Sequence, residues 1–351
     1  MDLLKILFIA IIFSSCAKLD YLYEQSVGQI SLMTKARANE EVVVNVRIPK
    51  DDREKIKKIQ ELKKYFYRYW GRKETAIYSK TSMLKNKAVT YLVIASPYNE
   101  IKAEETCFPL MGCFPYLGFF NIESARSFAK EKEDNGLITW VRPVYAYSTL
   151  GYFTDNILSS FFHYNDYELA ELIFHELFHT IFFVKNEVDL NENMANYFSK
   201  EMLEGYFKSI NREDYLKIHL KEDKEDKQLS LLVVDLVTEL DNLYKKSTPK
   251  TKAEADILLT EFLENKFKPE ILKKCQILNI EPKKCHPLEK KWNNARFAAF
   301  LTYEKNSDDI EKLQKKMGLD LKAYFHFIEN QYNDYTKQDS GKEFSEYLLG
   351  I

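Results

Sequence analysis

The stretch DYELAELIFHELFHTIFFVK, residues 166–185, decides the fold. Apolar side chains recur in it at spacings of three and four residues, which predicts a helix over the whole stretch. The helix would be apolar almost all the way round, and helices of that kind are buried. The rest of the chain is therefore expected to pack around it. The apolar positions are Leu169, Leu172, Ile173, Phe174, Leu177, Phe178, Ile181, Phe182 and Phe183.

The same stretch contains an HExxH pattern, His175-Glu176-Leu177-Phe178-His179. On a helix, residues four apart lie one turn above each other, so both imidazoles can reach one metal ion. Glu176 lies about 100° further round, where its carboxylate can reach a water at the metal without being a ligand. Two imidazoles and a carboxylate are costly to bury unless they are paired or hold a metal. The pattern predicts a site for one Zn²⁺ ion; the alternative is two core histidines that bond to backbone carbonyls.

A third metal ligand must come from outside this helix, because catalytic zinc usually has three protein ligands and one open position. The longer pattern HExxHxxGxxH is absent, since Phe182 and Lys185 stand where its glycine and its third histidine would be. The nearest carboxylates downstream are Glu187, Asp189 and Glu192, the last of which opens a further helical stretch. Glu192 would complete a His, His, Glu set, and a capping box with Asp189 is the alternative. Spacing alone does not decide between these two roles.

The first residues, MDLLKILFIAIIFSSC, combine one lysine with an apolar run over 6–13. The run is far shorter than the roughly 20 residues of a membrane-spanning helix, which favours a secretory signal peptide over 1–15. The tetrapeptide FSSC resembles a bacterial lipoprotein box, with Phe13 in place of the usual leucine, and Cys16 would then carry a diacylglycerol. We expect an exported bacterial lipoprotein anchored to the cell-envelope membrane, at its periplasmic or surface face. The alternative is an ordinary signal peptide with an incidental cysteine.

Export makes the remaining cysteines interpretable. Cys107 and Cys113 lie six residues apart, and Cys275 and Cys285 lie ten apart. In an oxidising compartment these four are candidates for two short-loop disulfides. A zinc site built from the same four cysteines is the competing interpretation, although neither pair has the CxxC spacing.

Composition and charge exclude several classes of protein. The 351 residues include only 10 Gly and 9 Pro, which excludes collagen-like and low-complexity chains and disfavours a turn-rich β-sandwich. With 51 basic and 53 acidic residues the formal net charge is -2, so bulk binding of nucleic acid is not expected. A helix-dominated globular protein remains.

Periodicity predicts a few strands early in the chain and helices late. We find no internal repeat and no Pro/Gly/Ser-rich linker, and the lysine-rich stretches 221–227 and 245–252 are expected to be loop or surface segments. The expected fold is a single α+β domain over 16–351 that is predominantly helical. Strands are predicted at 41–48, 89–96 and 137–141, and helices at 19–38, 51–70, 166–185, 191–209, 228–246, 252–268, 289–304 and 308–332.

Segments spread over most of the mature chain resemble the bacterial putative aminopeptidases, a family of zinc metallopeptidases that are often lipoproteins. The resemblance implies a zincin-like fold with a small sheet and the HExxH helix. It also implies that Glu192, 13 residues after His179, is the third ligand, which favours that role over the capping box. The chain departs from the family at Phe178 and Phe182, where a narrower substrate pocket is implied. The similar segments are 15–33, with Gly28-Gln29, 107–120, 145–160, 172–180, 191–198 and 293–303.

The resemblance implies zinc-dependent hydrolysis of peptide bonds, with an aminopeptidase as the first expectation. Zn²⁺ held by His175, His179 and Glu192 would activate water, and Glu176 would be the general base. The alternatives are a zinc endopeptidase of the cell envelope and a non-catalytic surface lipoprotein that binds a partner. A non-catalytic module has no use for Glu176, which argues against the last of these. The expected partners are a peptide substrate and, through the lipid, a membrane, in an oligomeric state that the sequence leaves open.

Further side chains are candidates for supporting roles. Glu171 and Asn191 are expected to orient the ligands. Residues 145–150 are expected to form an edge beside the site with which a substrate pairs. Arg296 would meet a substrate carboxylate, or else is an ion-paired surface residue. The candidate oxyanion donors are Tyr152, Tyr197 and Tyr303.

Overall fold

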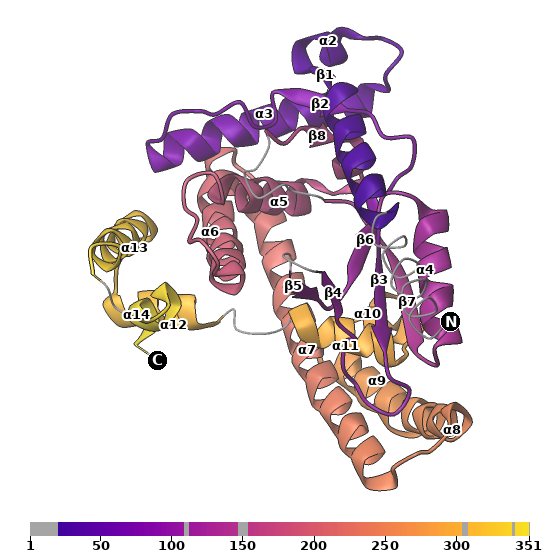
Figure 1. The fold of residues 1–351 in the computed structure, drawn as a ribbon. Coiled ribbons are helices and arrows are strands. Elements are labelled where there is room, and N and C mark those ends of the chain that lie inside the picture. The colour runs from indigo at the N-terminus through magenta and orange to yellow at the C-terminus, as the bar shows by residue number, and fades with distance from the viewer. Residues whose placement is uncertain (1–19, 109–111, 147–153, 304–307, 339–340, 351) are drawn as a thin grey trace. The chain divides into compact units, whose positions relative to one another are not determined.

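A computed structural model describes residues 20–108, 112–146, 154–303, 308–338 and 341–350 (Figure 1). They confirm a predominantly helical α+β fold. The described residues form two compact units. A single domain from residue 16 stays a prediction. Unit 1 comprises the described parts of Met1–Thr34, Ala88–Tyr145 and Lys221–Glu304, and unit 2 those of Lys35–Lys87, Ala146–Leu220 and Lys305–Ile351.

Unit 2 is built around helix α5 (Asp166–Phe178), as the apolar pattern predicts. Its side chains Leu169, Ile173 and Leu177 are fully buried. Helix α3 (Lys50–Trp70) and helix α6 (Val188–Ser209) pack against α5. The other elements are β1 (Arg37–Ala38), α2 (Asn39–Val44), β2 (Lys80–Ser82), β8 (Ile157–Leu158), the 3₁₀ helix Ser159–His163, the first residues of α7 (Glu213–Ser247), α12 (Asp308–Met317), α13 (Leu321–Tyr335) and α14 (Phe344–Leu349).

A small sheet with strand order β1-β2-β8 completes unit 2. Strand β1 pairs antiparallel with β2, and β8 pairs parallel with β2. An aromatic cluster fills the space between helices: Trp70, Phe178, Phe198 and Phe325 lie with ring centroids between 4.7 and 6.4 Å apart. These rings hold the second half of α5 against α3, α6 and α13.

Unit 1 centres on an antiparallel sheet with strand order β6-β3-β7. Helices α4 and α11 pack against β3 and β7 (Figure 1). The predicted strands 89–96 and 137–141 are confirmed by β3 (Thr90–Ser96) and β7 (Ile138–Val144). The other elements are a helix over 20–34, β4 (Thr106–Phe108), β5 (Gly112–Phe114), β6 (Leu117–Phe119), α4 (Ile122–Asp134), the rest of α7, α8 (Lys252–Phe262), a π-helical turn (Leu263–Phe267), α9 (Lys268–Ile277), the 3₁₀ helix Pro282–Lys284, α10 (His286–Glu289) and α11 (Asn294–Tyr303).

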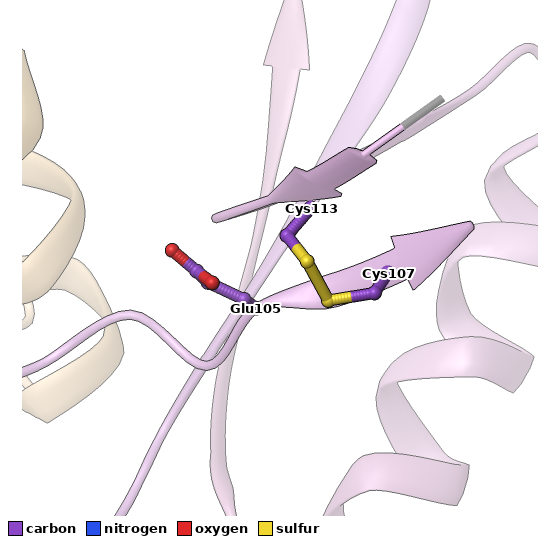
Figure 2. A group of neighbouring side chains, drawn as sticks. All are labelled: Glu105, Cys107 and Cys113. Carbon is purple, nitrogen blue, oxygen red and sulfur yellow. A yellow bond between two sulfur atoms is a disulfide. The ribbon is translucent and has the colours of Figure 1, made fainter. Parts of the chain in front are cut away.

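Both predicted cysteine pairs form disulfides in unit 1. Cys107 and Cys113 face each other across β4 and β5, and Cys275 joins Cys285 in the core. The alternative of a zinc site built from these cysteines is therefore wrong, because a sulfur in a disulfide offers no thiolate. The same argument removes Glu105 with Cys107 and Cys113 as a metal group, although their ligand atoms lie within 4.8 Å of one another (Figure 2).

The strand predicted at 41–48 is wrong, because α2 and a turn occupy these residues. The buried side chain of Asn39 donates to the carbonyl of Tyr78 and accepts from the hydroxyl of Thr81, each at 2.8 Å. These bonds, together with the backbone bond from Asn39 to Ser79, fix the start of α2 beside β2. Tertiary hydrogen bonds thus override the β-branched run EVVV.

Candidate metal centre

Helix α5 is fixed at its start by a capping box. The side chain of Asn165 accepts from the amides of Tyr167 and Glu168, and Glu168 accepts in return from the amide of Asn165, all at 2.9 Å. Asp166 forms ion pairs with Arg212 at 2.6 Å and with Lys55 at 3.4 Å. The N-terminus of the helix that carries the HExxH pattern is therefore held by hydrogen bonds and charge.

Helix α5 ends at Phe178, earlier than the predicted 185, and His179 is its C-cap residue. The amides of Thr180 and Ile181 bond back to Leu177 and Phe178, three residues earlier, which tightens the last turn. The hydroxyl of Thr180 also bonds to Leu177 at 2.6 Å. No glycine or proline marks this end in the sequence, so periodicity alone overshoots it.

Asn191 shapes the turn that delivers the next helix. Its buried side chain accepts from the amide of Val184 at 2.8 Å and donates to the carbonyls of Val184 and Glu187 at 2.7 and 2.8 Å. Asn186, inside this turn, adopts a left-handed backbone with φ of 67°. The closed turn lets α6 begin at Val188 and places Glu192 on its second turn, so Asn191 supports a ligand through the backbone.

The structure brings the three expected ligands together from α5 and α6, which lie side by side (Figure 1). The Nε2 atoms of His175 and His179 are 3.3 Å apart. Oε2 of Glu192 lies 3.2 Å from Nε2 of His175, and Oε1 lies 3.5 Å from Nε2 of His179. The side chain of His179 is only 4% exposed and that of Glu192 is 40% exposed. The site is thus closed on its histidine side and more open toward Glu192.

The capping-box alternative for Glu192 does not hold. The N-cap residue of α6 is Glu187, and no side chain bonds to the cap of this helix. Both carboxylate oxygens of Glu192 instead face the histidines. Ala195, one turn further on, is fully buried, which allows α5 and α6 to approach closely.

The charges of the cluster are coupled. Burial lowers the pKa of His175, but the hydrogen bond to Glu192 and the charges of Glu176 and Glu192 outweigh it and raise the pKa overall. Burial and the neighbouring His175 lower the pKa of His179 to about 4. Burial raises the pKa of Glu192, but the two histidines lower it further, so the carboxylate is ionised. Near pH 7 the cluster therefore offers one neutral imidazole and a carboxylate, which are ligand forms for a cation.

Tyr78 interacts electrostatically with Glu176 of the motif, which the sequence analysis did not predict. It is 2% exposed and adopts a left-handed backbone with φ of 56°. Burial raises its pKa well above 10.0, and the negative charges of Glu176 and Asp155 raise it further. The phenol is thus protonated, and the charge of the Glu176 carboxylate contributes to keeping it so. Its distance from the motif, 97 residues before His175, left no signal in the sequence.

Asn196 also escaped the sequence analysis. Its side chain forms a hydrogen bond with His175, one of the interactions that raise the pKa of this histidine. Asn196 lies one turn after Glu192 on α6, so its position on the same helix face could have identified it. A polar partner of this kind orients a ligating imidazole.

Other candidate residues have contacts of their own or lie outside the described residues, so their roles stay predictions. Glu171 forms an ion pair with Lys200 of α6, with 3.7 Å between the charged atoms. The hydroxyl of Tyr197 donates to Gln314 of α12. Tyr152, Cys16 and most of 145–150 lie outside the described residues, as does the side chain of Tyr303.

The two phenylalanines and Arg296 also have structural surroundings. Phe178 and Phe182 are 1% and 7% exposed and pack against Phe325, so they fill the core instead of narrowing a pocket. Arg296, in unit 1, lies over the rings of Trp140 and Trp292, at 4.7 and 5.3 Å from their centroids. Its guanidinium donates to the carbonyl of Lys291, so its partners are two aromatic rings and a carbonyl group.

Comparison with known protein families gives a match over nearly the whole chain. A model of the family described as putative aminopeptidase matches residues 20–341. No curated protein and no solved structure matches the chain.

Proposed function

Because this chain belongs to the putative aminopeptidase family, we propose that it is a zinc-dependent peptidase whose metal ligands are His175, His179 and Glu192. The family supports a peptidase in general terms. The zinc ion, the ligand set and the release of N-terminal residues are our proposal. The observation that carries it is the geometry of the three ligand atoms.

The ligand atoms have the spacing of a tetrahedral zinc site. Zinc–nitrogen and zinc–oxygen bonds are about 2.0–2.1 Å, so two ligand atoms of one tetrahedron lie about 3.3–3.4 Å apart. The two Nε2 atoms are 3.3 Å apart, and the two oxygens of Glu192 lie 3.2 and 3.5 Å from them, one oxygen for each nitrogen. Two histidines and one carboxylate are also a donor set of catalytic zinc sites, in which a fourth position stays open for water. The residues therefore fit the ion in both spacing and chemistry.

Glu176 is the proposed general base. Bound zinc would supply a Lewis acid that makes a water more acidic and a peptide carbonyl more electrophilic. Glu176 follows the first ligand by one residue, which turns its side chain about 100° away from that ligand. From there its carboxylate accepts the proton of the attacking water and then delivers it to the leaving amine.

The test is metal content and peptide hydrolysis measured together. We expect the wild type to bind one zinc per chain and to hydrolyse peptides. Glu176→Gln should keep the zinc and lose activity by a factor of at least about 100, because only the proton acceptor changes. The matched control is Glu204→Gln, the same change on an exposed glutamate of α6. This variant should keep both the zinc and the peptidase activity. Stoichiometric zinc absent from the wild type, or full activity in Glu176→Gln, would refute the proposal.

The choice between exopeptidase and endopeptidase has its own experiment. An aminopeptidase binds a free N-terminal amine, so it should cleave free peptides and fail on their N-acetylated forms. An envelope endopeptidase should cleave both. A zinc-loaded chain that cleaves neither would be the non-catalytic binding protein.

The proposal includes export and a lipid on Cys16. The two disulfides support an oxidising compartment. Among the described residues no helix is both long and apolar enough to cross a membrane. We propose that the lipid on Cys16 attaches the chain to the membrane, so Cys16→Ser should abolish labelling of the protein by a fatty acid. A Cys16→Ser variant that still carries the label would contradict the lipid's role.

A further inference from the structure

The helix over 20–34 has one face that packs within unit 1. Tyr21 lies edge-on against Phe119, with ring centroids 5.2 Å apart. Nε2 of Gln25 donates to the carbonyl of Gly118 at 2.9 Å. These contacts fix the rotation of the helix about its axis and so determine which side chains face away.

The opposite face is apolar and exposed. At 100° per residue, its seven side chains fall within an arc of about 140° that contains no charged residue. Five are apolar: Leu22, Tyr23, Val27, Ile30 and Met33, which are 36%, 72%, 46%, 58% and 41% exposed. Contiguous exposed apolar surface of this kind marks an interaction site.

The two remaining side chains of the face are Ser26 and Thr34, and their hydroxyl groups do not need water as a hydrogen-bond acceptor. The hydroxyl of Ser26 donates to the carbonyl of Leu22, and that of Thr34 donates to the carbonyl of Ile30, each at 2.8 Å. Both hydroxyl protons are therefore used inside the helix. The whole face can leave water without losing a hydrogen bond from these two donors.

The position of the face in the chain points to its occupant. Cys16 precedes Asp20 by four residues, which span at most about 14 Å even when extended. A diacylglycerol on Cys16 would keep the start of this helix at the lipid surface. A face without charges suits the acyl boundary of a bilayer better than a partner that is selected by ion pairs.

We propose that the exposed face of residues 20–34 lies in the interface of a phospholipid bilayer beside the lipid on Cys16. The inference depends on the lipid anchor and is independent of the peptidase activity. From Leu22 to Met33 the helix rises about 16 Å, so its contact with the bilayer is long and narrow. The contact along the helix and the lipid anchor together restrict the tilt of unit 1 on the membrane. A lipid anchor alone does not restrict this tilt.

The experiment tests the face without the lipid. The mature chain from residue 16 carries Cys16→Ser, and Ile30→Cys then supplies the single free thiol, since the other four cysteines are in disulfides. An environment-sensitive fluorophore on this thiol should shift to the blue with vesicles of phosphatidylethanolamine and phosphatidylglycerol. Lipid-borne quenchers should quench it. Ile257→Cys, on α8 of the same unit and 59% exposed, is the matched control and should not respond.

Vesicle sedimentation provides a second readout. Val27→Ser with Ile30→Ser should lower the partition coefficient of the Cys16→Ser chain by about tenfold or more, because two apolar side chains no longer enter the lipid. The control is the double variant Ile257→Ser with Ile277→Ser, whose partition coefficient should stay within about twofold of that of the Cys16→Ser chain.

Two fluorescence results would overturn the proposal: no response to vesicles from the fluorophore at residue 30, or an equal response from the fluorophore at residue 257. A blue shift that appears without vesicles at high protein concentration would assign the face to a second copy of the chain. This result would also overturn the proposal. Peptide hydrolysis is not a readout, so this failure leaves the peptidase proposal intact.

Discussion

At the scale of single residues, Asn191 positions the proposed metal ligand Glu192 through the backbone of the turn before α6. It forms three bonds to the backbone around the turn before α6. Asn191→Ala leaves buried backbone groups without partners, each at a cost of about 1–3 kcal/mol. We expect the free energy of unfolding to fall by about 2–4 kcal/mol and zinc affinity to fall about 10–100-fold.

Chemical denaturation and zinc titration measure the two effects of Asn191→Ala. Asn193→Ala, two residues further on in the same helix, is the control and should change both quantities little. Unchanged zinc affinity in Asn191→Ala would show that Glu192 does not depend on this turn.

Asp166 gives a prediction about acid stability. Burial raises its pKa, but Arg212 and Lys55 outweigh burial and hold the pKa below the ordinary value of 3.8. A carboxyl whose pKa is lower in the folded state stabilises the fold above 3.8, and this contribution is lost as pH falls through the lower folded value. Wild type should therefore lose stability more steeply than Asp166→Asn below pH 3.8. Denaturation curves between pH 2 and 6 test this; parallel curves would count against the ion pairs.

Residue roles near the motif could be predicted where they follow from helix geometry. His175, His179 and Glu176 follow from spacing alone, and Glu192 needed the family resemblance to outweigh a capping box. The interaction of Tyr78 with Glu176 could not be predicted, because it arises from tertiary packing of a residue that is distant in the sequence. The role of Tyr197 stays a prediction; its hydroxyl bonds to Gln314, a direction that its position in the sequence does not fix.

At the scale of elements, Gly28 permits the helix over 20–34 to approach the segment after β6. A Cβ atom at this position would lie 2.1 Å from Cδ2 of Phe120. Gly28→Ala must displace the ring, so we expect a loss of about 1–3 kcal/mol in stability despite the better helix propensity of alanine. Ser26→Ala on the exposed face should stay within about 0.5 kcal/mol. Thermal unfolding compares the two, and a stabilised Gly28→Ala would show that the helix is not packed closely.

The bounds of a helix could be predicted where the hydrophobic pattern extended over many residues and where residues that cap or end a helix marked its termini. Helix α3 matches its prediction, and it ends at Gly71, whose φ of 62° is the conformation that glycine adopts readily. The helix predicted at 308–332 is instead two, because Gly318 with φ of 63° ends α12 and Asp320 caps α13. Residues 221–227, expected as a loop or surface segment, lie inside α7, and none of them is buried, so the surface alternative holds and the loop does not.

At the scale of the whole molecule, division into two units left no trace in the composition. The sequence has no Pro/Gly/Ser-rich linker between them, and α7 contributes residues to both. Segments of each unit alternate along the chain, so the units depend on contacts between residues far apart in sequence. Periodicity reports only local structure, which is why it could suggest the fold class and not this division.

Glu187 connects α14 to the turn before the proposed ligand Glu192. Its carboxylate accepts from the amides of Phe344 and Ser345 at 2.6 and 2.8 Å, and its side chain is nearly buried. Glu187→Ala should therefore lower the free energy of unfolding by about 2–4 kcal/mol, since charge-assisted bonds are the stronger ones. Glu343→Ala, which removes an exposed carboxylate beside the same amides, should have little effect. Equal losses in both variants would argue against the role of Glu187.

The bond from Glu187 to α14 also makes the turn before Glu192 sensitive to truncation. Phe344 and Ser345 supply two backbone donors to the Glu187 carboxylate. A chain cut before Phe344 would leave this nearly buried carboxylate without those donors, in the turn that precedes α6. Loss of α14 would therefore disturb the proposed ligand Glu192 through the turn, although α14 contributes no ligand itself.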